Sequence, residues 1–444
     1  MKAAHILLSA VLGLGLTLAG CSRRDAPSGP KLVVISPHNK NIESEFERAF
    51  LAHYAAKHGE KVEIEWRDIG GGGSAILSYV RNVYEQSDAS GIDLLFGGGE
   101  MAFEKLAAEK LLQPLKLSTD VLDHVPATFG GLEMYDPEHL WAGAAVSGFG
   151  FLYNKTRLAQ LGVQPPATWD DLADPRFYGQ VALADPMKSS SANVSYEMIV
   201  QSGADWPDGW AKLLGVLGNA AKFYDGASRA ADAVLSEAPV ATCIDFYGAL
   251  RVAKYPKHLV YVSPKGQTAF TPDPIAILKN PPHGELAQAF VDFVMSRQGQ
   301  ALWAVKPGAD GGPKTHQLGR QPIRRDVYTA YEGKLLPWIV NPYEAGNEMK
   351  LDVEMKQVRF GVLRNLVCIA AVENLSGLQK ARKAIIDAGL PPDRVKAFVE
   401  LPPDLRTRQD VFGTAEKLRD KTEADRVLTG WRAFFRDKYA RLAG

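Results

Sequence analysis

Residues 92–112, IDLLFGGGEMAFEKLAAEKLL, join a short apolar run to a glycine triplet and then to a segment typical of a helix. An apolar run of this length bounded by glycine predicts a buried strand. The same order occurs twice before it, because the predicted strands at 31–36 and 62–66 are each followed by a loop and a helical pattern. Repeated strand–loop–helix units predict an α/β lobe with a mostly parallel sheet.

Three loops follow these predicted strands: SPHN at 36–39, a four-glycine run at 70–73 and FGGGE at 96–100. In such sheets the loops after the strands meet at one edge, where ligands bind, and glycine lets the backbone come close to a ligand. Neither glycine run has the sequence of a Walker A loop or a dinucleotide fingerprint. Tight turns would explain each run alone, but three together predict a binding edge. The candidate residues there are Ser36, His38, Asn39, Gly98 and Gly99.

A second α/β unit is predicted after residue 141. Residues 141–155 (WAGAAVSGFGFLYNK) predict two strands that cross from the first lobe, and residues 221–250 predict a strand–turn–helix–strand run. Residues 261–279 predict strands that return to the first lobe, and residues 286–304 predict one long helix. The order of elements therefore indicates two lobes that exchange segments of chain.

Residues 185–195, DPMKSSSANVS, place polar side chains between a predicted strand and a predicted helix. The first turn of a helix has unpaired amides and a partial positive charge, which attract anions. Capping needs only one such residue, and no Glu or Gln follows any serine by three positions to form a capping box. We therefore predict an anion site, with simple capping by Ser190 or Ser191 as the alternative. The polar donors are Lys188, Ser189, Ser190, Ser191 and Asn193.

The first residues have the pattern of an export signal. Met1 and Lys2 lead into an apolar run at 6–20 that is too short to span a bilayer. The tetrapeptide LAGC, which ends at Cys21, resembles a bacterial lipobox, and this resemblance implies removal of residues 1–20 and a lipid on Cys21. Residues 21–30 then form a polar tether. The expected product is an exported lipoprotein that faces the periplasm or the cell exterior; an ordinary signal with a chance cysteine is the alternative.

The composition excludes several classes of protein. The chain has 51 basic and 51 acidic residues and no later apolar run long enough to cross a bilayer, so neither a nucleic-acid surface nor a spanning helix is predicted. Cys243 and Cys368 lie in apolar contexts, which favours buried free thiols over a disulfide. No cluster of His and Cys has the spacing of a zinc site.

Several segments together resemble a known family. They are ISPHNKNIESEFERAF (35–50), LLFGGGEMAFEKLAAEKLLQPL (94–115), GFLYNK (150–155), TWDDLADPRFYGQVALADP (168–186) and AFVDFVMSRQGQALW (289–303). In this order, over residues 31–328, they resemble the extracellular solute-binding proteins of bacterial ABC importers. The resembling group includes the ferric-iron-binding proteins and their relatives that bind phosphonates or sugar phosphates.

This resemblance implies a two-lobed periplasmic-binding-protein-like α/β fold with a hinge and a ligand cleft. It assigns residues 31–142 and 267–300 to lobe 1, and residues 143–266 and 301–331 to lobe 2. It also implies a monomer without cofactor or enzymatic activity, which delivers a solute to an ABC permease served by a separate ATPase subunit. In the family, the turn that matches residues 185–195 binds a phosphate-like or carbonate-like anion.

The resemblance also bears on the kind of solute. Iron-binding members use two adjacent tyrosines of the second lobe, but the matching stretch here, CIDFYG at 243–248, has only Tyr247, and the acid of the first lobe falls on Gly98. This pattern favours an organic anion such as a phosphonate or sugar phosphate, with Asp245 accepting from an amine or hydroxyl of the solute. Coordination of ferric iron by Tyr247 and Asp245 beside a bound anion is the alternative.

Further candidates come from turns near the expected cleft. Ser228 and Arg229 begin a predicted helix, where Arg229 would hold an anion through two hydrogen bonds, and Asp273 lies where the chain re-enters the first lobe. Surface turns explain these residues equally well. An exported phosphoester hydrolase using His38 and Asp245 is a rival function, although no Gly-x-Ser-x-Gly or HExxH motif is present. A sensor subunit would use the same cleft and is the other rival.

Residues 332–444 extend beyond the usual length of the family and predict a mostly helical extension that docks on one lobe. The last helical segment carries apolar residues on one face, which predicts a packed core and not a partner site. These residues are Val427, Leu428, Trp431, Phe434, Phe435, Tyr439 and Leu442.

Overall fold

The computed structural model describes residues 29–344, 346 and 349–444. The predicted signal peptide and Cys21 lie outside the described residues.

The first lobe is built on a mixed sheet with the strand order β2-β1-β3-β13-β4, in which β7 also pairs with β13. Strands β1, β2 and β3 run parallel, as predicted, whereas β13 is antiparallel to β3, β4 and β7 because it returns from the second lobe. The strands are β1 (Lys31–Ile35), β2 (Glu63–Arg67), β3 (Leu94–Phe96), β4 (Leu112–Gln113), β7 (Ala142–Ser147) and β13 (Thr271–Leu278).

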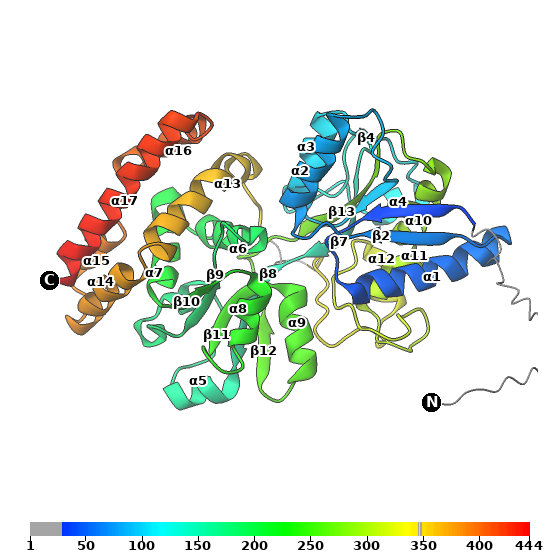
Figure 1. The fold of residues 1–444 in the computed structure, drawn as a ribbon. Coiled ribbons are helices and arrows are strands. Elements are labelled where there is room, and N and C mark those ends of the chain that lie inside the picture. The colour runs from blue at the N-terminus through cyan, green and yellow to red at the C-terminus, as the bar shows by residue number, and fades with distance from the viewer. Residues whose placement is uncertain (1–28, 345, 347–348) are drawn as a thin grey trace, which may run out of the picture.

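Helices cover both faces of this sheet (Figure 1). On β1, Leu32 and Val34 belong to the core that contains α1, whereas Val33 and Ile35 belong to the core under α2 and α3. This division follows from the alternation of side chains along a strand. The helices are α1 (Lys40–His58), α2 (Gly73–Tyr84), α3 (Glu100–Ala108) and α4 (Thr119–His124).

The second lobe has a mixed five-stranded sheet with the order β10-β9-β11-β8-β12. Its strands are β8 (Phe149–Asn154), β9 (Val181–Ala184), β10 (Ala220–Tyr224), β11 (Val240–Ile244) and β12 (Leu259–Val262). Its helices are α5 (Lys155–Leu161), α6 (Ser190–Gln201), α7 (Trp206–Gly218), α8 (Ala227–Ala233) and α9 (Asp245–Lys254). Both lobes and the helical extension were expected from the sequence.

The chain crosses between the lobes at Gly148, which joins β7 to β8, and again at residues 263–270 between β12 and β13. Figure 1 shows β7 between the two lobes. A backbone hydrogen bond of 2.9 Å from Val146 to Gln321 ties β7 to the segment that follows α11 (Arg297–Ala304). The chain crosses once more between α12 (Arg325–Ala330) and α13 (Val353–Val367).

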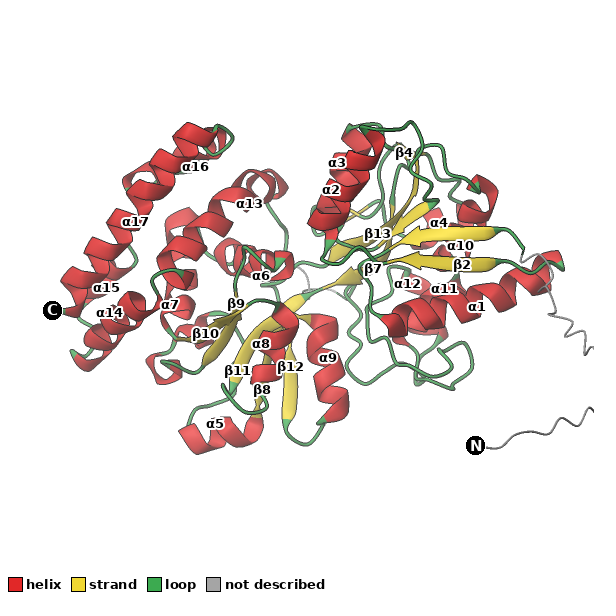
Figure 2. Ribbon diagram, viewed as in Figure 1, coloured by secondary structure: helices red, strands yellow, loops and turns green. Residues whose placement is uncertain are grey.

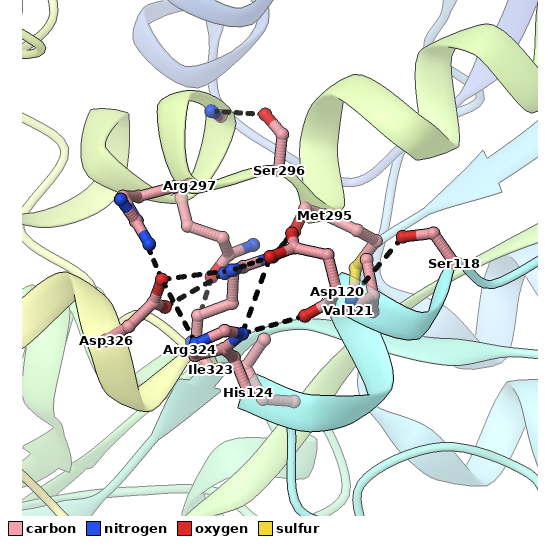
Figure 3. A network of polar contacts seen from close by, with 12 residues as sticks. Ser118, Asp120, Val121, His124, Met295, Ser296, Arg297, Ile323, Arg324 and Asp326 are labelled. Atoms are coloured by element: carbon pink, nitrogen blue, oxygen red, sulfur yellow. Dashed lines mark hydrogen bonds and ion pairs between the residues drawn. The ribbon is translucent and has the colours of Figure 1, made fainter.

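Residues 301–331 pack on the first lobe, whereas the sequence placed them with the second. Trp303 donates a 2.8 Å hydrogen bond to the carbonyl of Ala144 in β7. Arg324, which is 0% exposed, pairs with Asp120 of α4 at 2.8 Å and with Asp326 of α12 at 3.0 Å (Figure 3). A buried guanidinium needs such partners, and Asp120 supplies one from the first lobe.

The helix predicted at 286–304 is two helices, α10 (Gly284–Met295) and α11. Ser296 between them is extended, with φ −69° and ψ 159°, and its Oγ accepts a 3.0 Å hydrogen bond from the amide of Gly299. This is an N-cap, which starts a new helix.

The extension consists of α13, a π-helical turn (Cys368–Val372) and α14 (Leu375–Asp387), α15 (Pro392–Phe398), α16 (Arg408–Lys417) and α17 (Lys421–Ala443). It lies on the second lobe beside α6 and α7 (Figures 1 and 2). The apolar face of α17 is buried as predicted: Trp431, Phe435, Tyr439 and Leu442 belong to the core, and Val427, Leu428 and Phe434 pack against it.

No single described helix is long and apolar enough to cross a membrane, although Val353–Val372 and Leu375–Asp387 meet these criteria as a pair bent by 71°. Cys243 is buried, Cys368 is half-buried, and both are free thiols.

Candidate functional site

A cavity of about 630 Å³ lies between the lobes. Loops of both lobes line it, together with the hinge strands and helix α13 of the extension. The lining segments are 37–38, 71–73 and 98–102 of the first lobe, 186–191, 226–228 and 246–247 of the second lobe, 271–273 at the hinge, and Arg320, Lys356, Phe360 and Arg364. A volume of this size suits a small organic ligand.

The serine turn, residues 185–191, reaches this cavity at the start of α6. Ser189 is the N-cap, because its Oγ accepts a 3.3 Å hydrogen bond from the amide of Ala192. The amides of Ser190 and Ser191 make no hydrogen bond to a described residue. One serine is therefore sufficient for capping, and the next two residues present amide and hydroxyl donors to the cavity.

Asn193, one turn further along α6, does not line the cavity. Its side chain is buried, and Nδ2 donates a 3.1 Å hydrogen bond to the carbonyl of Phe360 in the extension. This hydrogen bond connects α6 to α13. A direct contact between Asn193 and the solute stays a prediction.

Asp273 occupies the opposite side of the cavity and is already bound by the protein. Its Oδ1 accepts hydrogen bonds from the amides of Gly98 (2.8 Å) and Gly99 (3.0 Å). Its Oδ2 pairs with Arg320 and with His38 Nε2. Burial acts to raise the pKa of Asp273, but Arg320 and these hydrogen bonds outweigh it and hold the pKa well below its usual range. The amides of the FGGGE loop thus bind an internal carboxylate.

His38 is neutral at pH 7, because burial lowers its pKa more than Asp273 raises it. Nε2 lies 2.9 Å from Asp273 Oδ2, which only accepts, and 3.0 Å from Arg320 Nη1, which only donates. Nδ1 is buried with no partner among the described residues. Gly97 has φ +83°, and a Cβ there would lie 2.4 Å from His38 Nε2, so only glycine fits this close approach.

Arg320 is a cavity residue that sequence reasoning missed. It is 4% exposed; Nη2 donates a 3.0 Å hydrogen bond to Ser147 Oγ, and the guanidinium carbon lies 4.7 Å from the centre of the Phe246 ring. Its Nε is buried without a partner among the described residues. No motif surrounds Arg320, and it meets Asp273 across 47 positions of sequence.

A family profile described as bacterial extracellular solute-binding protein matches residues 89–309. Residues 89–309 of this chain therefore belong to the extracellular solute-binding proteins. The phosphoglycerate transport regulatory protein PgtC of Salmonella typhimurium is 28% identical over 226 residues, which are 51% of this chain and 54% of PgtC. The matched part of the chain thus spans about half the length of PgtC. An uncharacterized protein of Haemophilus influenzae is 26% identical over 308 residues, 68% of this chain and 83% of that protein.

Solved structures of binding proteins share the fold. The periplasmic binding protein AfuA of Actinobacillus pleuropneumoniae, with fructose-6-phosphate bound, has a TM-score of 0.58 at 18% identity over 82% of this chain and 100% of AfuA. The apo ferric ion-binding protein A of Pasteurella haemolytica has a TM-score of 0.56 at 17% identity over 76% of this chain and 96% of that protein.

In the second lobe of this solute-binding protein, Tyr247 lines the cavity and Asp245 does not. Asp245 is 5% exposed and accepts hydrogen bonds from the amides of Gly148 (2.9 Å) and Phe246 (2.7 Å), so it binds the hinge. Burial raises its pKa to about 6. Tyr247 does line the cavity, and burial raises the pKa of its phenol.

The remaining candidates make contacts within the protein. Ser228 lines the cavity, but its Oγ accepts a 2.7 Å hydrogen bond from Arg251. Arg229 is outside the cavity and pairs with Asp225 at 3.1 Å. Ser36 donates to the carbonyl of Phe96 at 2.8 Å, and Asn39 caps α1. The cavity therefore brings together His38, Gly98, Gly99, Ser189, Ser190, Ser191, Ser228, Tyr247 and Asp273.

The charges around the cavity suit an anion. Both carboxylates that line it are paired, Glu100 with Lys356 and Asp273 with Arg320. Tyr247 is the only phenol among the described lining residues, so the cavity offers few of the anionic oxygen ligands that ferric iron prefers. Among the described residues, no group of three or more His, Cys, Asp or Glu is placed to hold a metal ion. The basic lining residues are Lys105, Lys188, Arg320, Lys356 and Arg364.

Proposed function

We propose that this protein captures a small anionic solute between its lobes and delivers it to an ABC permease with a separate ATPase subunit. The observation that carries this proposal is the cavity between the lobes, where the unpaired amides of Ser190 and Ser191 meet a surplus of basic side chains. A buried donor without a partner, Arg320 Nε, is a second indication of a ligand. The family membership supports the transport role.

In the proposed mechanism, the acid group of the solute docks on the first turn of α6. There the amides and hydroxyls of Ser190 and Ser191 donate hydrogen bonds, and Lys188 adds a positive charge. The hinge at Gly148 and residues 263–270 lets the lobes close around the solute. The solute shifts the protein toward the closed form only by the difference between its affinities for the closed and open forms.

A phosphorylated solute is the class we propose. PgtC is named for phosphoglycerate transport, and the AfuA structure holds fructose-6-phosphate. The ferric-iron alternative has weaker support, because the cavity offers one phenol and no unpaired carboxylate among its described lining residues.

Titration calorimetry with fructose 6-phosphate, 3-phosphoglycerate, an alkyl phosphonate and ferric citrate tests this proposal. We expect a phosphorylated probe to bind with release of heat, and Ser190→Ala to weaken it about tenfold, since a hydrogen bond to a charged group contributes about 1.5–3 kcal/mol. Ser190→Ala leaves the Ser189 cap in place, so the melting temperature should not change. Binding of ferric citrate alone, abolished by Tyr247→Phe, would instead establish iron transport.

A sensor role is the second candidate, because PgtC is named a transport regulatory protein. Deletion of the gene separates the two roles. An importer subunit is required for uptake of labelled solute even when the permease is expressed from a constitutive promoter. A sensor subunit is required only for induction of the transport genes by the solute.

The family is extracellular, which supports export. We propose a lipid on Cys21, which labelled palmitate should detect in the full chain and not in Cys21→Ser. We also propose a monomer that leaves its solute chemically unchanged. Size-exclusion chromatography with light scattering and recovery of intact solute from the complex test these two points; release of inorganic phosphate would favour the hydrolase.

A further inference from the structure

Helix α13 of the extension forms part of the cavity wall. Lys356, Phe360 and Arg364 line the cavity, and their spacing of four residues places them on one face of the helix. These residues lie outside 89–309, the region that the solute-binding family profile matches. Helix α13 thus adds a surface to the site beside those of the two lobes.

Two buried contacts fix α13 to the helix that carries the serine turn. Arg359 forms an ion pair with Glu197 of α6 at 2.6 Å and 3.1 Å, and both side chains are buried. Asn193 of α6 donates to the carbonyl of Phe360. Because α13 is also tied to the first lobe by the buried ion pair between Lys356 and Glu100, it contacts both lobes beside the cavity.

Arg364 lies beside the serine turn. One turn before it, Phe360 contacts α6 through Asn193. One turn after it, partial burial raises the pKa of the Cys368 thiol, and Asp185 is close enough to add to this rise. Residues 185–191 form the turn itself. Arg364 thus stands between two contacts that flank the proposed anion site.

The guanidinium of Arg364 has no hydrogen-bond or ion-pair partner among the described residues, and its Nε is buried. A buried donor without a partner costs free energy, and more so when it is charged. No hydrogen bond or ion pair to a described residue offsets this cost, and Arg364 lines the cavity that holds the proposed anion-binding turn.

We propose that Arg364 binds a second acidic group of the solute, so that the extension selects solutes with two anionic groups. This inference rests on the proposed function. The first group, a phosphate, docks on Ser190 and Ser191, and the second, a carboxylate or phosphate, accepts hydrogen bonds from Arg364. Phe360, between Lys356 and Arg364 on the same face, contacts the carbon chain that joins the two groups.

Titration calorimetry with matched probes tests the second contact. Glycerol 3-phosphate carries one acidic group, and 3-phosphoglycerate carries a carboxylate in addition. We expect the full chain to bind 3-phosphoglycerate at least tenfold more tightly, and Arg364→Met to remove this preference while changing the affinity for glycerol 3-phosphate less than twofold. Arg436→Met, which removes the same charge from a side chain of α17 that is 71% exposed, should change neither affinity.

The unliganded proteins give a second readout. Because Arg364 has no partner, Arg364→Met should melt at the same temperature as the natural protein or above it, whereas a structural arginine would lower the melting temperature. If glycerol 3-phosphate binds but Arg364→Met weakens both probes equally or neither, this inference is wrong and the anion-binding function stands. If neither probe nor fructose 1,6-bisphosphate binds the natural protein, both proposals fail.

Discussion

The two helices α3 and α6 both begin at the cavity, but the residues that lead into them make different contacts. Before α3, Asp273 accepts from the amides of Gly98 and Gly99, and the first helical residue is the acidic Glu100. At α6, the first helical residue is Ser190, and its amide has no hydrogen-bond partner among the described residues. Both helix N-termini carry partial positive charge, but only α3 has a carboxylate as its first residue and a second one bound at its N-cap.

This difference separates a structural helix end from a binding one. Glycine-rich and serine-rich turns look equally suited to an anion in the sequence, because both expose backbone amides. The anion at α3 is built into the chain, so the glycine loop serves to hold Asp273, Arg320 and His38 together. In the serine turn, Asp185 accepts a 2.9 Å hydrogen bond from the amide of Met187, but the amides of Ser190 and Ser191 have no partner among the described residues and are open to a solute.

The largest effect is expected where the internal anion is removed. Asp273→Ala leaves Arg320 and His38 without their buried partner and should lower the free energy of unfolding by about 3–5 kcal/mol. Asp273→Asn keeps an acceptor for the glycine amides and should cost less. Urea denaturation at pH 7 measures both; a loss below about 1 kcal/mol in Asp273→Ala would mean that the α3 end does not depend on this carboxylate.

A second buried carboxylate, Asp245, can be compared with Asp273, because Asp245 forms no ion pair with a described residue. Its pKa is about 6, against about 3.9 in an unfolded chain, so the folded protein binds the proton more tightly. The free energy of unfolding therefore falls as pH rises from about 4 to about 6, by up to about 3 kcal/mol. The depressed pKa of Asp273 adds stability that is fully present above about pH 5; this contribution is the same in the natural protein and in a variant at Asp245.

Asp245→Asn should remove this dependence on pH. Urea denaturation of both proteins at pH 4.5 and pH 6.5 should show the variant gaining stability relative to the natural protein at the higher pH. A difference between the two proteins that is the same at both pH values would contradict the raised pKa. Asp225→Asn, at a carboxylate that is half-exposed and paired with Arg229, is the matched control and should give no such change.

Most of the fold follows from local patterns in the sequence. The strands and helices of both lobes were expected because their apolar residues repeat at the period of a strand or a helix. The break between α10 and α11 was missed, although Ser296 is of a residue type that often caps the start of a helix. The placement of residues 301–331 was wrong for a different reason, since only the long-range pair of Arg324 with Asp120 sets it.

The candidate site was predictable where one local turn contains several polar residues, but not where residues far apart in the sequence meet. The serine turn stands out because Ser189, Ser190, Ser191 and Asn193 fall within five positions where a helix begins. By contrast, His38 and Asp273 are 235 positions apart, and nothing in either loop indicates that they bind one another. One sequence signal for α13 was not used. Lys356, Phe360 and Arg364 repeat at four-residue spacing, which places two basic residues and an aromatic ring on one side of a helix.

The smallest effect on stability, and the most direct test of the comparison, comes from making the α6 end resemble the α3 end. Ser190→Glu places a carboxylate at the position that Glu100 occupies in α3. It should stabilise the helix by up to about 1 kcal/mol and weaken a phosphorylated probe at least tenfold, because the built-in charge competes for the same amides. Ser190→Gln has nearly the same shape without the charge, and should retain most of the affinity in the same calorimetric titration. If Ser190→Glu and Ser190→Gln bind the probe equally well, the solute's acid group does not lie at this turn, and the two helix ends do not differ in the way their contacts indicate.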